Sequence, residues 1–204
     1  MTSVVYPRTM YRHPDSDGAS PTDDAPVSNP RIPPGRFADL GPINWVFARG
    51  AARAIGVRDA HIFSTLGRTR GLFRGWLHFA ARLMPFGALS RKESEMVIIR
   101  VAHLRECAYE LDHHRRLGRR AGISSDEFER ILTGPDAGWG DRERALLRAV
   151  DQLVLDKDID DITWAALRRH LDDRRLIAFV LLVGNYDMLA TTIHTLRIQR
   201  DTRV

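Results

Sequence analysis

The residues best suited to chemistry lie between Glu95 and His114. Between these two ends stand the only cysteine of the chain, Cys107, and a second carboxylate, Glu110. If residues 107 to 120 form a helix, then Cys107, Glu110 and His114 are spaced i, i+3 and i+7 and share one face. Burying a thiol, an imidazole and carboxylates in an apolar bundle is unfavourable unless they serve a purpose. We therefore interpret this stretch as an active site for acid–base or thiol chemistry, with these four residues lining one pocket.

Each of these residues also has an ordinary structural explanation. A single cysteine in a helical protein is usually a small buried hydrophobic residue. Glu110 precedes His114 by four residues, which is the spacing of a surface pair on a helix. In a site, the same spacing predicts that Glu110 pairs with His114 and favours the protonated imidazole. Glu95 belongs to the preceding helix, so it joins the others only if the two helices pack together.

The elements that must position these residues are helices. Apolar residues recur at helical spacing, and two serine–glutamate pairs, Ser90–Glu93 and Ser124–Glu127, have the spacing of capping boxes. No segment shows sustained alternation of apolar and polar residues, so no sheet is expected. The predicted fold class is all-α, a compact multi-helix bundle. Its main helices are expected to begin near residues 42, 72, 90, 107, 124, 141, 160 and 174.

The last predicted helix carries polar residues in the middle of an apolar sequence. Asn185, Tyr186 and Asp187 follow the apolar residues 176–183, and His194 comes later in the same helix. Either the helix emerges into solvent here, or Asn185 or Tyr186 lines the same pocket as Glu95. No metal or other cofactor is expected, because no zinc-site spacing of cysteine and histidine is present.

Composition divides the chain into an N-terminal arm and one domain. Residues 1–35 are rich in Pro, Asp, Ser and Gly, which predicts a flexible arm, free or lying on a neighbouring subunit. Residues 36–204 are expected to form a single helical domain. The net charge of +5 comes from dispersed arginines rather than a basic run, so nucleic acid is not an expected partner. With no long apolar segment and no secretory signal, we expect no membrane partner and a cytoplasmic location.

The stretch from Ser90 to Gly122 resembles the carboxymuconolactone decarboxylase family, which includes the alkylhydroperoxidase D-like proteins. The matching segments are RKESE at 91–95, VIIRVA at 97–102, YELDHH at 109–114 and RAG at 120–122. Residues 30–34, 62–66 and 181–190 look like segments of the longer members. The resemblance implies an all-helical fold that usually assembles into trimers or hexamers.

Glu110 marks a departure from the peroxidase branch of this family. That branch carries Glu, then Cys-x-x-Cys, then His, and its reaction ends in a disulfide between the two cysteines. Because Glu110 replaces the second cysteine, that step has no internal partner for Cys107. The decarboxylase-like branch instead has Glu and His at the positions of Glu110 and His114. The sequence therefore looks closer to the branch that performs acid–base chemistry, although Cys107 is retained.

The preferred prediction is a carboxymuconolactone decarboxylase-like enzyme that decarboxylates or isomerises a small carboxylated or lactone molecule. His114 and Glu110 would exchange protons with the substrate, and Glu95 would be a second proton carrier. Arg100 and Arg105 are candidates for binding a substrate carboxylate.

Two alternatives remain open at this stage. One is an alkylhydroperoxidase-like thiol peroxidase that uses Cys107 alone, and the other is a non-catalytic binding protein on the same fold. The apolar faces of residues 72–84 and 176–183 also predict a homo-oligomer, since large apolar patches usually mark interfaces. Further residues expected to contact the substrate are Tyr109, His113, Asn185 and Tyr186.

Overall fold

The structure, a computed structural model, describes residues 29–202. Over these residues the chain forms nine α-helices and one short 3-10 turn, with no strand, which confirms the predicted all-α class. Most of the predicted N-terminal arm, residues 1–28, lies outside the described residues. The elements are α1 (Phe37–Ile55), α2 (His61–Leu66), η1 (Gly67–Thr69), α3 (Gly71–Leu83), α4 (Arg91–Leu104), α5 (Ala108–Arg120), α6 (Ser125–Thr133), α7 (Asp141–Leu155), α8 (Asp161–Arg168) and α9 (Asp173–Leu196).

Local sequence signals determine where α4 and α6 begin. The hydroxyl groups of Ser90 and Ser124 accept hydrogen bonds from the backbone N–H groups three residues later, at 3.2 and 3.1 Å. The side chains of Glu93 and Glu127 accept bonds from the serine N–H groups in return. Both predicted capping boxes are therefore present, and they satisfy N–H groups that a helix start leaves unpaired.

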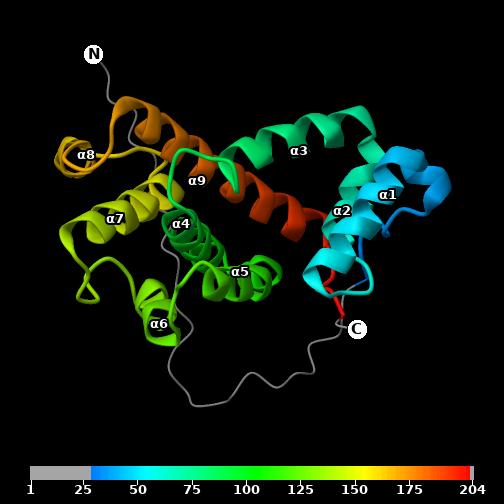
Figure 1. The fold of residues 1–204 in the computed structure, drawn as a ribbon, viewed down its shortest axis with the longest axis horizontal. Helices are drawn as coiled ribbons and strands as arrows, with labels where there is room; N and C mark the ends of the chain where they lie inside the picture. The colour runs from blue at the N-terminus through cyan, green and yellow to red at the C-terminus, as the bar shows by residue number, and fades with distance from the viewer. Residues whose placement is uncertain (1–28, 203–204) are drawn as a thin grey trace.

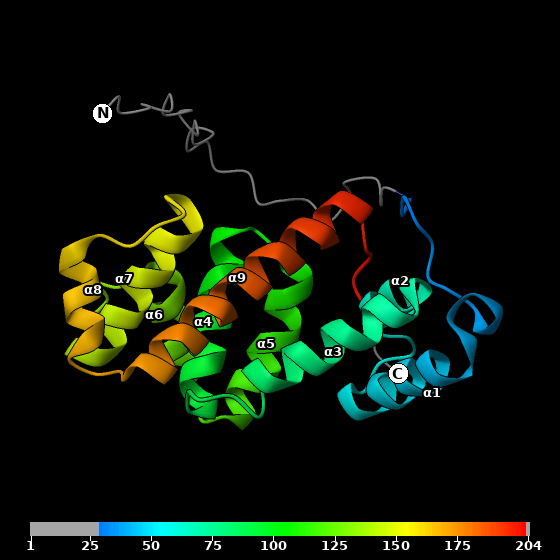
Figure 2. The same ribbon diagram turned by 90° about the horizontal axis from the view of Figure 1, so that it is seen from above.

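Helix α4 forms the centre of the core. Every residue from Ser94 to Ala102 is buried, as its nearly continuous apolar sequence predicts. Helix α9 crosses α4 and runs along the molecule from the side of α7 and α8 towards α2 (Figures 1 and 2). The main core joins these helices through residues such as Val97, Leu146 and Phe179. Helix α4 thus forms the support on which both α9 and α5, the predicted site helix, are packed.

Helix α9 is also apolar along most of its length. Among the described helices it alone is long and apolar enough to cross a membrane, with a mean hydropathy of 1.7 in its most apolar window. Half of that window is buried inside the protein. A core helix meets the same criteria of length and composition, so this property is weak support for a membrane span.

The described part of the predicted arm is attached to the helices. The backbone N–H of Arg31 donates to the Leu196 carbonyl oxygen at 3.0 Å, and that of Gly35 donates to the Ser64 carbonyl oxygen at 2.9 Å. Residues 31–35 therefore pack against α2 and the end of α9. The prediction of a flexible arm up to residue 35 is wrong for this segment, because its backbone groups have partners in the domain.

Candidate active site

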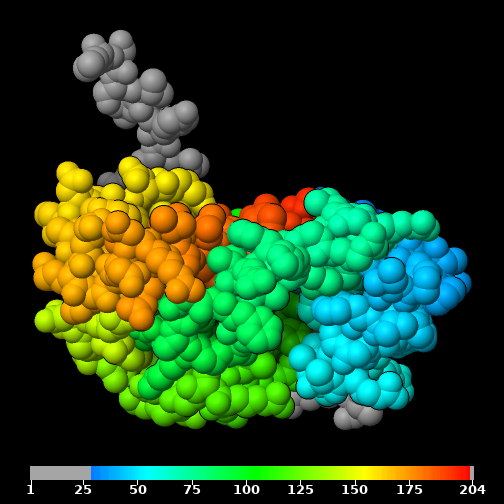
Figure 3. Space-filling view, turned by 45° about the horizontal axis from the view of Figure 1, so that its top comes forward, coloured from blue at the N-terminus to red at the C-terminus, as the bar shows by residue number. Residues whose placement is uncertain are grey.

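A cavity of about 360 Å³ is lined by α1, α2 and α3 together with α5 and α9. Figure 3 shows a recess where the surfaces of α1, α3 and α5 approach one another. Helices α1 to α3 and the turn after α3 contribute aromatic, aliphatic, methionine and proline side chains, whereas the other polar lining residues come from α5 and α9. The polar lining residues are Tyr109, Glu110, His113, His114, Asn185 and Tyr186.

His114 and Glu95 form a buried pair across the contact between α5 and α4. The His114 Nδ1 atom lies 2.7 Å from Glu95 Oε2, and the Glu95 side chain is fully buried. Arg91 balances the charge of this carboxylate, with its Nη2 atom 2.8 Å from Glu95 Oε1. Because a carboxylate accepts, the Nδ1 atom carries a proton, and in the neutral imidazole Nε2 is then the acceptor. No described residue hydrogen-bonds to that Nε2 atom, so it is available to a molecule in the cavity.

The Glu110 carboxyl group lines the same cavity but has no hydrogen-bond partner among the described residues. Burial raises the pKa of Glu110 to about 8, the nearby Cys107 thiol lowers it in part, and the charge of Asp187 raises it. Glu110 therefore keeps its proton at neutral pH. The predicted pairing of Glu110 with His114 is wrong, because the hydrogen bond of the imidazole is made to Glu95 on α4 instead.

Cys107 is the N-cap residue of α5, and its side chain is fully buried. Burial, reinforced by the charge of Glu110, raises the pKa of the Cys107 thiol to about 12. Neither Cys107 nor Glu95 is among the residues that line the cavity. The prediction that all four residues line one pocket is therefore wrong for these two, although Glu95 acts on the cavity through its bond to His114.

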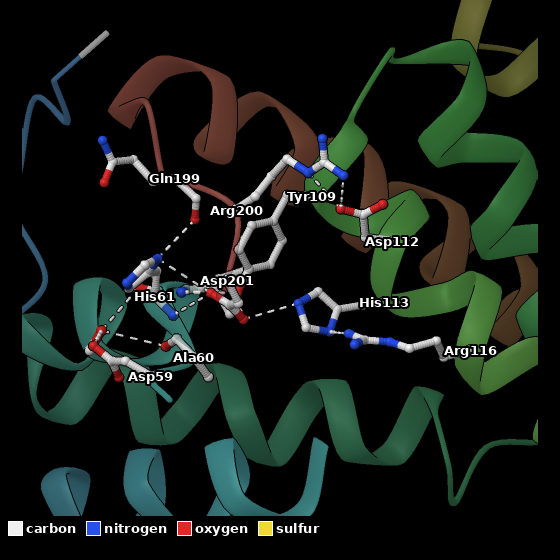
Figure 4. A network of polar contacts seen from close by, with 12 residues as sticks. Asp59, Ala60, His61, Tyr109, Asp112, His113, Arg116, Gln199, Arg200 and Asp201 are labelled. Carbon is white, nitrogen blue, oxygen red and sulfur yellow. Dashed lines mark hydrogen bonds and ion pairs between the residues drawn. The ribbon is translucent and has the colours of Figure 1, made fainter. Parts of the chain in front are cut away.

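Tyr109 and His113 line the cavity while their polar atoms are held by Asp201, near the C-terminus (Figure 4). The Tyr109 hydroxyl donates to Asp201 Oδ2 at 2.9 Å, and His113 Nε2 lies 3.0 Å from the same oxygen. The other oxygen, Oδ1, accepts from the backbone N–H of His61 at 2.9 Å. Asp201 thereby ties α2 to α5, and no signal in the sequence near Asp201 points to this role.

Asn185 and Tyr186 on α9 complete the polar side of the cavity. The Trp76 Nε1–H group donates to Asn185 Oδ1 at 3.1 Å, which leaves the amide NH₂ of Asn185 as the free donor. Tyr186 meets the His114 ring edge to face, with ring centroids 5.2 Å apart. The sequence allowed this polar cluster either to emerge into solvent or to line the pocket, and Asn185 and Tyr186 line the cavity. Trp76 belongs to the aromatic face of α3. The sequence predicts a subunit interface for that face, whereas in the structure Trp76 lines the cavity.

The arginines considered as substrate ligands lie elsewhere. Arg100 binds both carboxylate oxygens of Asp151, at 2.6 and 2.9 Å. Arg105 is paired with Asp187 at 3.3 Å. No arginine or lysine of the described chain lines the cavity.

Residues 70–152 match the carboxymuconolactone decarboxylase family, whereas no curated protein matches the chain significantly. A peroxidase-related protein from Ralstonia eutropha, described as an alkylhydroperoxidase AhpD core, has the same fold. It is 18% identical, with a TM-score of 0.72 over 84% of this chain and 92% of that one. A peroxidase-related protein from Silicibacter sp. TM1040 is 15% identical, with a TM-score of 0.71 over 86% and 95% of the two chains.

The debrominase Bmp8 is a third structure of this kind. It is 14% identical, with a TM-score of 0.67 over 83% of this chain and 91% of that one. A cysteine-to-alanine variant of Bmp8 is known in complex with 2,3,4-tribromopyrrole. The match over residues 70–152 and the AhpD-like fold of the described chain both agree with the resemblance seen in the sequence.

The structural relatives are described as peroxidase-related proteins or as a debrominase. At such low identity, however, they establish the fold rather than the reaction. The reaction has to be argued from the site.

Proposed function

We propose that the protein is an acid–base enzyme in which His114 is the general base and Glu110 the general acid. The observation that carries this proposal is the complementary state of two groups lining one cavity. His114 presents a free acceptor, Nε2, while burial keeps the proton on Glu110 at neutral pH. Proton transfer is most effective when the acid and the base titrate near the working pH.

The reaction that fits these states is the interconversion of a carbonyl compound and its enol. His114 Nε2 takes a proton from the carbon beside the carbonyl while Glu110 gives its proton to the carbonyl oxygen. This step yields a neutral enol, an imidazolium ion paired with Glu95, and a Glu110 carboxylate. Return of the His114 proton to a different carbon of a conjugated substrate, with Glu110 recovering its own proton, gives an isomer.

Isomerisation is better supported than decarboxylation. Loss of carbon dioxide begins from a bound carboxylate, and burying that charge beside no cation is unfavourable. No arginine of the described chain lines the cavity, and Arg91 and Arg105 are paired with Glu95 and Asp187.

Hydrogen–deuterium exchange at the methyl group of acetophenone, followed by NMR in heavy water, tests this proposal. The wild-type protein is expected to accelerate exchange, and Glu110→Gln is expected to slow the catalysed rate about 100-fold. Glu129→Gln changes an exposed glutamate on α6 and serves as the matched control. The proposal is wrong if acetophenone binds and exchange is no faster than in buffer.

A second function, peroxide reduction by Cys107, is supported by the peroxidase-related structural relatives. In that reaction the Cys107 thiolate attacks a hydroperoxide oxygen, forming a sulfenic acid and releasing the alcohol. Two equivalents of an external thiol then restore the thiol, with release of water and a disulfide. Complete burial and the raised pKa of Cys107 both oppose the first step.

Consumption of cumene hydroperoxide in the presence of dithiothreitol distinguishes the two functions. Acid–base chemistry predicts no consumption above the buffer rate. Consumption that Cys107→Ser abolishes and Glu110→Gln preserves would establish the thiol as the working group.

A further inference from the structure

The cavity is apolar on three helices, and no arginine or lysine of the described chain lines it. Phe63, Trp76 and Met84 contribute to the apolar lining. Two buried carboxylates lie next to the polar side: Glu95, which Arg91 neutralises, and Asp201, which is bonded to Tyr109 and His113. A carboxylate entering this space would lose its hydration and meet no arginine or lysine side chain, which is unfavourable in an apolar medium.

The polar groups that face the cavity are instead suited to a neutral acceptor. Asn185 offers its NH₂ group because its oxygen is held by Trp76. The Tyr186 hydroxyl is a donor with no hydrogen-bond partner among the described residues, and burial raises the pKa of Tyr186, so this proton is retained. Together with Glu110, these groups offer three donors to one oxygen atom, and the His114 Nε2 atom faces the same cavity.

We infer that the cavity selects an uncharged, apolar molecule of single-ring size with one carbonyl oxygen, and excludes the corresponding carboxylate. This inference deepens the proposed function, on which the role of Glu110 and His114 rests. The volume of about 360 Å³ lies at the small end of ligand pockets. The carbonyl oxygen is placed at Glu110, Asn185 and Tyr186, and the ring against the aromatic side chains of α2 and α3.

Three probes of similar size separate the contribution of the carbonyl oxygen to binding from the effect of charge. Acetophenone is neutral and has the carbonyl oxygen, benzoate has the same ring with a charge, and ethylbenzene has neither. Calorimetric or NMR titration at pH 7 is expected to show acetophenone binding at least about tenfold more tightly than the other two. Tyr186→Phe should weaken acetophenone about fivefold and leave ethylbenzene unchanged, since it removes one hydrogen bond with little change of shape.

A change of charge provides the sharper test. Leu77 is a half-buried lining residue of α3, and the adjacent His78 is exposed and outside the lining. Leu77→Arg supplies the missing cation and is expected to raise benzoate affinity about tenfold or more. His78→Arg adds the same charge to the same helix outside the cavity and should leave benzoate affinity unchanged.

The outcomes separate ligand selection from chemistry. If benzoate binds the wild-type protein as tightly as acetophenone, or if Leu77→Arg and His78→Arg act alike, the inferred selectivity is wrong. If selectivity is as described but acetophenone exchange is not accelerated, the inference stands and the acid–base function fails.

Discussion

His113 and His114 are adjacent on α5, and each faces a buried carboxylate, but their surroundings differ. His113 Nε2 lies 3.0 Å from Asp201, and its Nδ1 accepts from Arg116 at 2.9 Å, so both ring nitrogens are engaged. His114 engages only Nδ1, on Glu95, and no described residue bonds to its Nε2. Two imidazoles with similar carboxylate partners therefore differ in what they leave free for a ligand.

The two carboxylates also belong to different parts of the fold. Glu95 lies on the central helix α4, whose residues are buried throughout its middle. Asp201 lies in the C-terminal segment after α9, where it joins α2 and α5 across the cavity wall (Figure 4). In the proposed function His114 takes part in the chemistry, whereas His113 belongs to the attachment that shapes the cavity wall.

The largest expected effect separates the two histidines directly. His114→Gln should reduce acetophenone exchange at least about 100-fold, because it removes the base. His113→Gln, the matched neighbour, should reduce exchange less than about tenfold, since its ring nitrogens are already bonded. Deuterium incorporation measured by NMR under saturating ketone provides both values. Equal losses in the two variants would contradict the assignment.

Because Asp201 attaches α2 to α5, its substitution is expected to lower the stability of the protein. Asp201→Asn should lower the free energy of unfolding by about 2 kcal/mol, because it weakens hydrogen bonds to a side chain that is only 2% exposed. Asp112→Asn is the control, since Asp112 forms a nearby but exposed ion pair with Arg200. That control should change stability by less than about 0.5 kcal/mol in urea unfolding. Similar losses of unfolding free energy in both variants would show that the contacts of Asp201 stabilise the protein no more than the exposed Asp112–Arg200 pair does.

Much of the fold could be predicted from sequence because its signals are local. The capping boxes at Ser90 and Ser124 and the apolar spacing within each helix depend on neighbouring residues. Asp201 could not be predicted, because its role arises from contacts with residues about 90 and 140 positions away. The i, i+4 spacing wrongly predicted Glu110 as the partner of His114. The actual partner is Glu95, which the packing of α4 against α5 brings to the imidazole.

A further prediction concerns how stability depends on pH. The pKa of Glu110 is raised from 4.5 to about 8 in the folded protein. Between these values the folded state holds a proton that the unfolded state releases, so stability falls as pH rises. The slope is at most about 1.4 kcal/mol per pH unit. Glu110→Gln should remove this contribution, so its melting temperature relative to the wild type should rise between pH 5 and 8. A pH-independent difference would contradict the buried, protonated state.

The smallest effect is expected at Cys107. Cys107→Ser should alter acetophenone exchange less than about threefold, because the thiol does not line the cavity. In the native protein the thiol should also react slowly with iodoacetamide, and rapidly after unfolding, because it is fully buried. Rapid reaction of the folded protein would instead show that Cys107 is accessible.

The most direct test of the central claim is a titration of the Glu110 carboxyl carbon by ¹³C NMR. Glutamate is labelled at Cδ, and the Glu110 signal is identified by its absence in Glu110→Gln. The account predicts a midpoint near pH 8, so that Glu110 is a carboxylic acid at neutral pH and able to donate its proton. A midpoint near the ordinary value of 4.5 would show a carboxylate at neutral pH and would contradict Glu110 as the general acid.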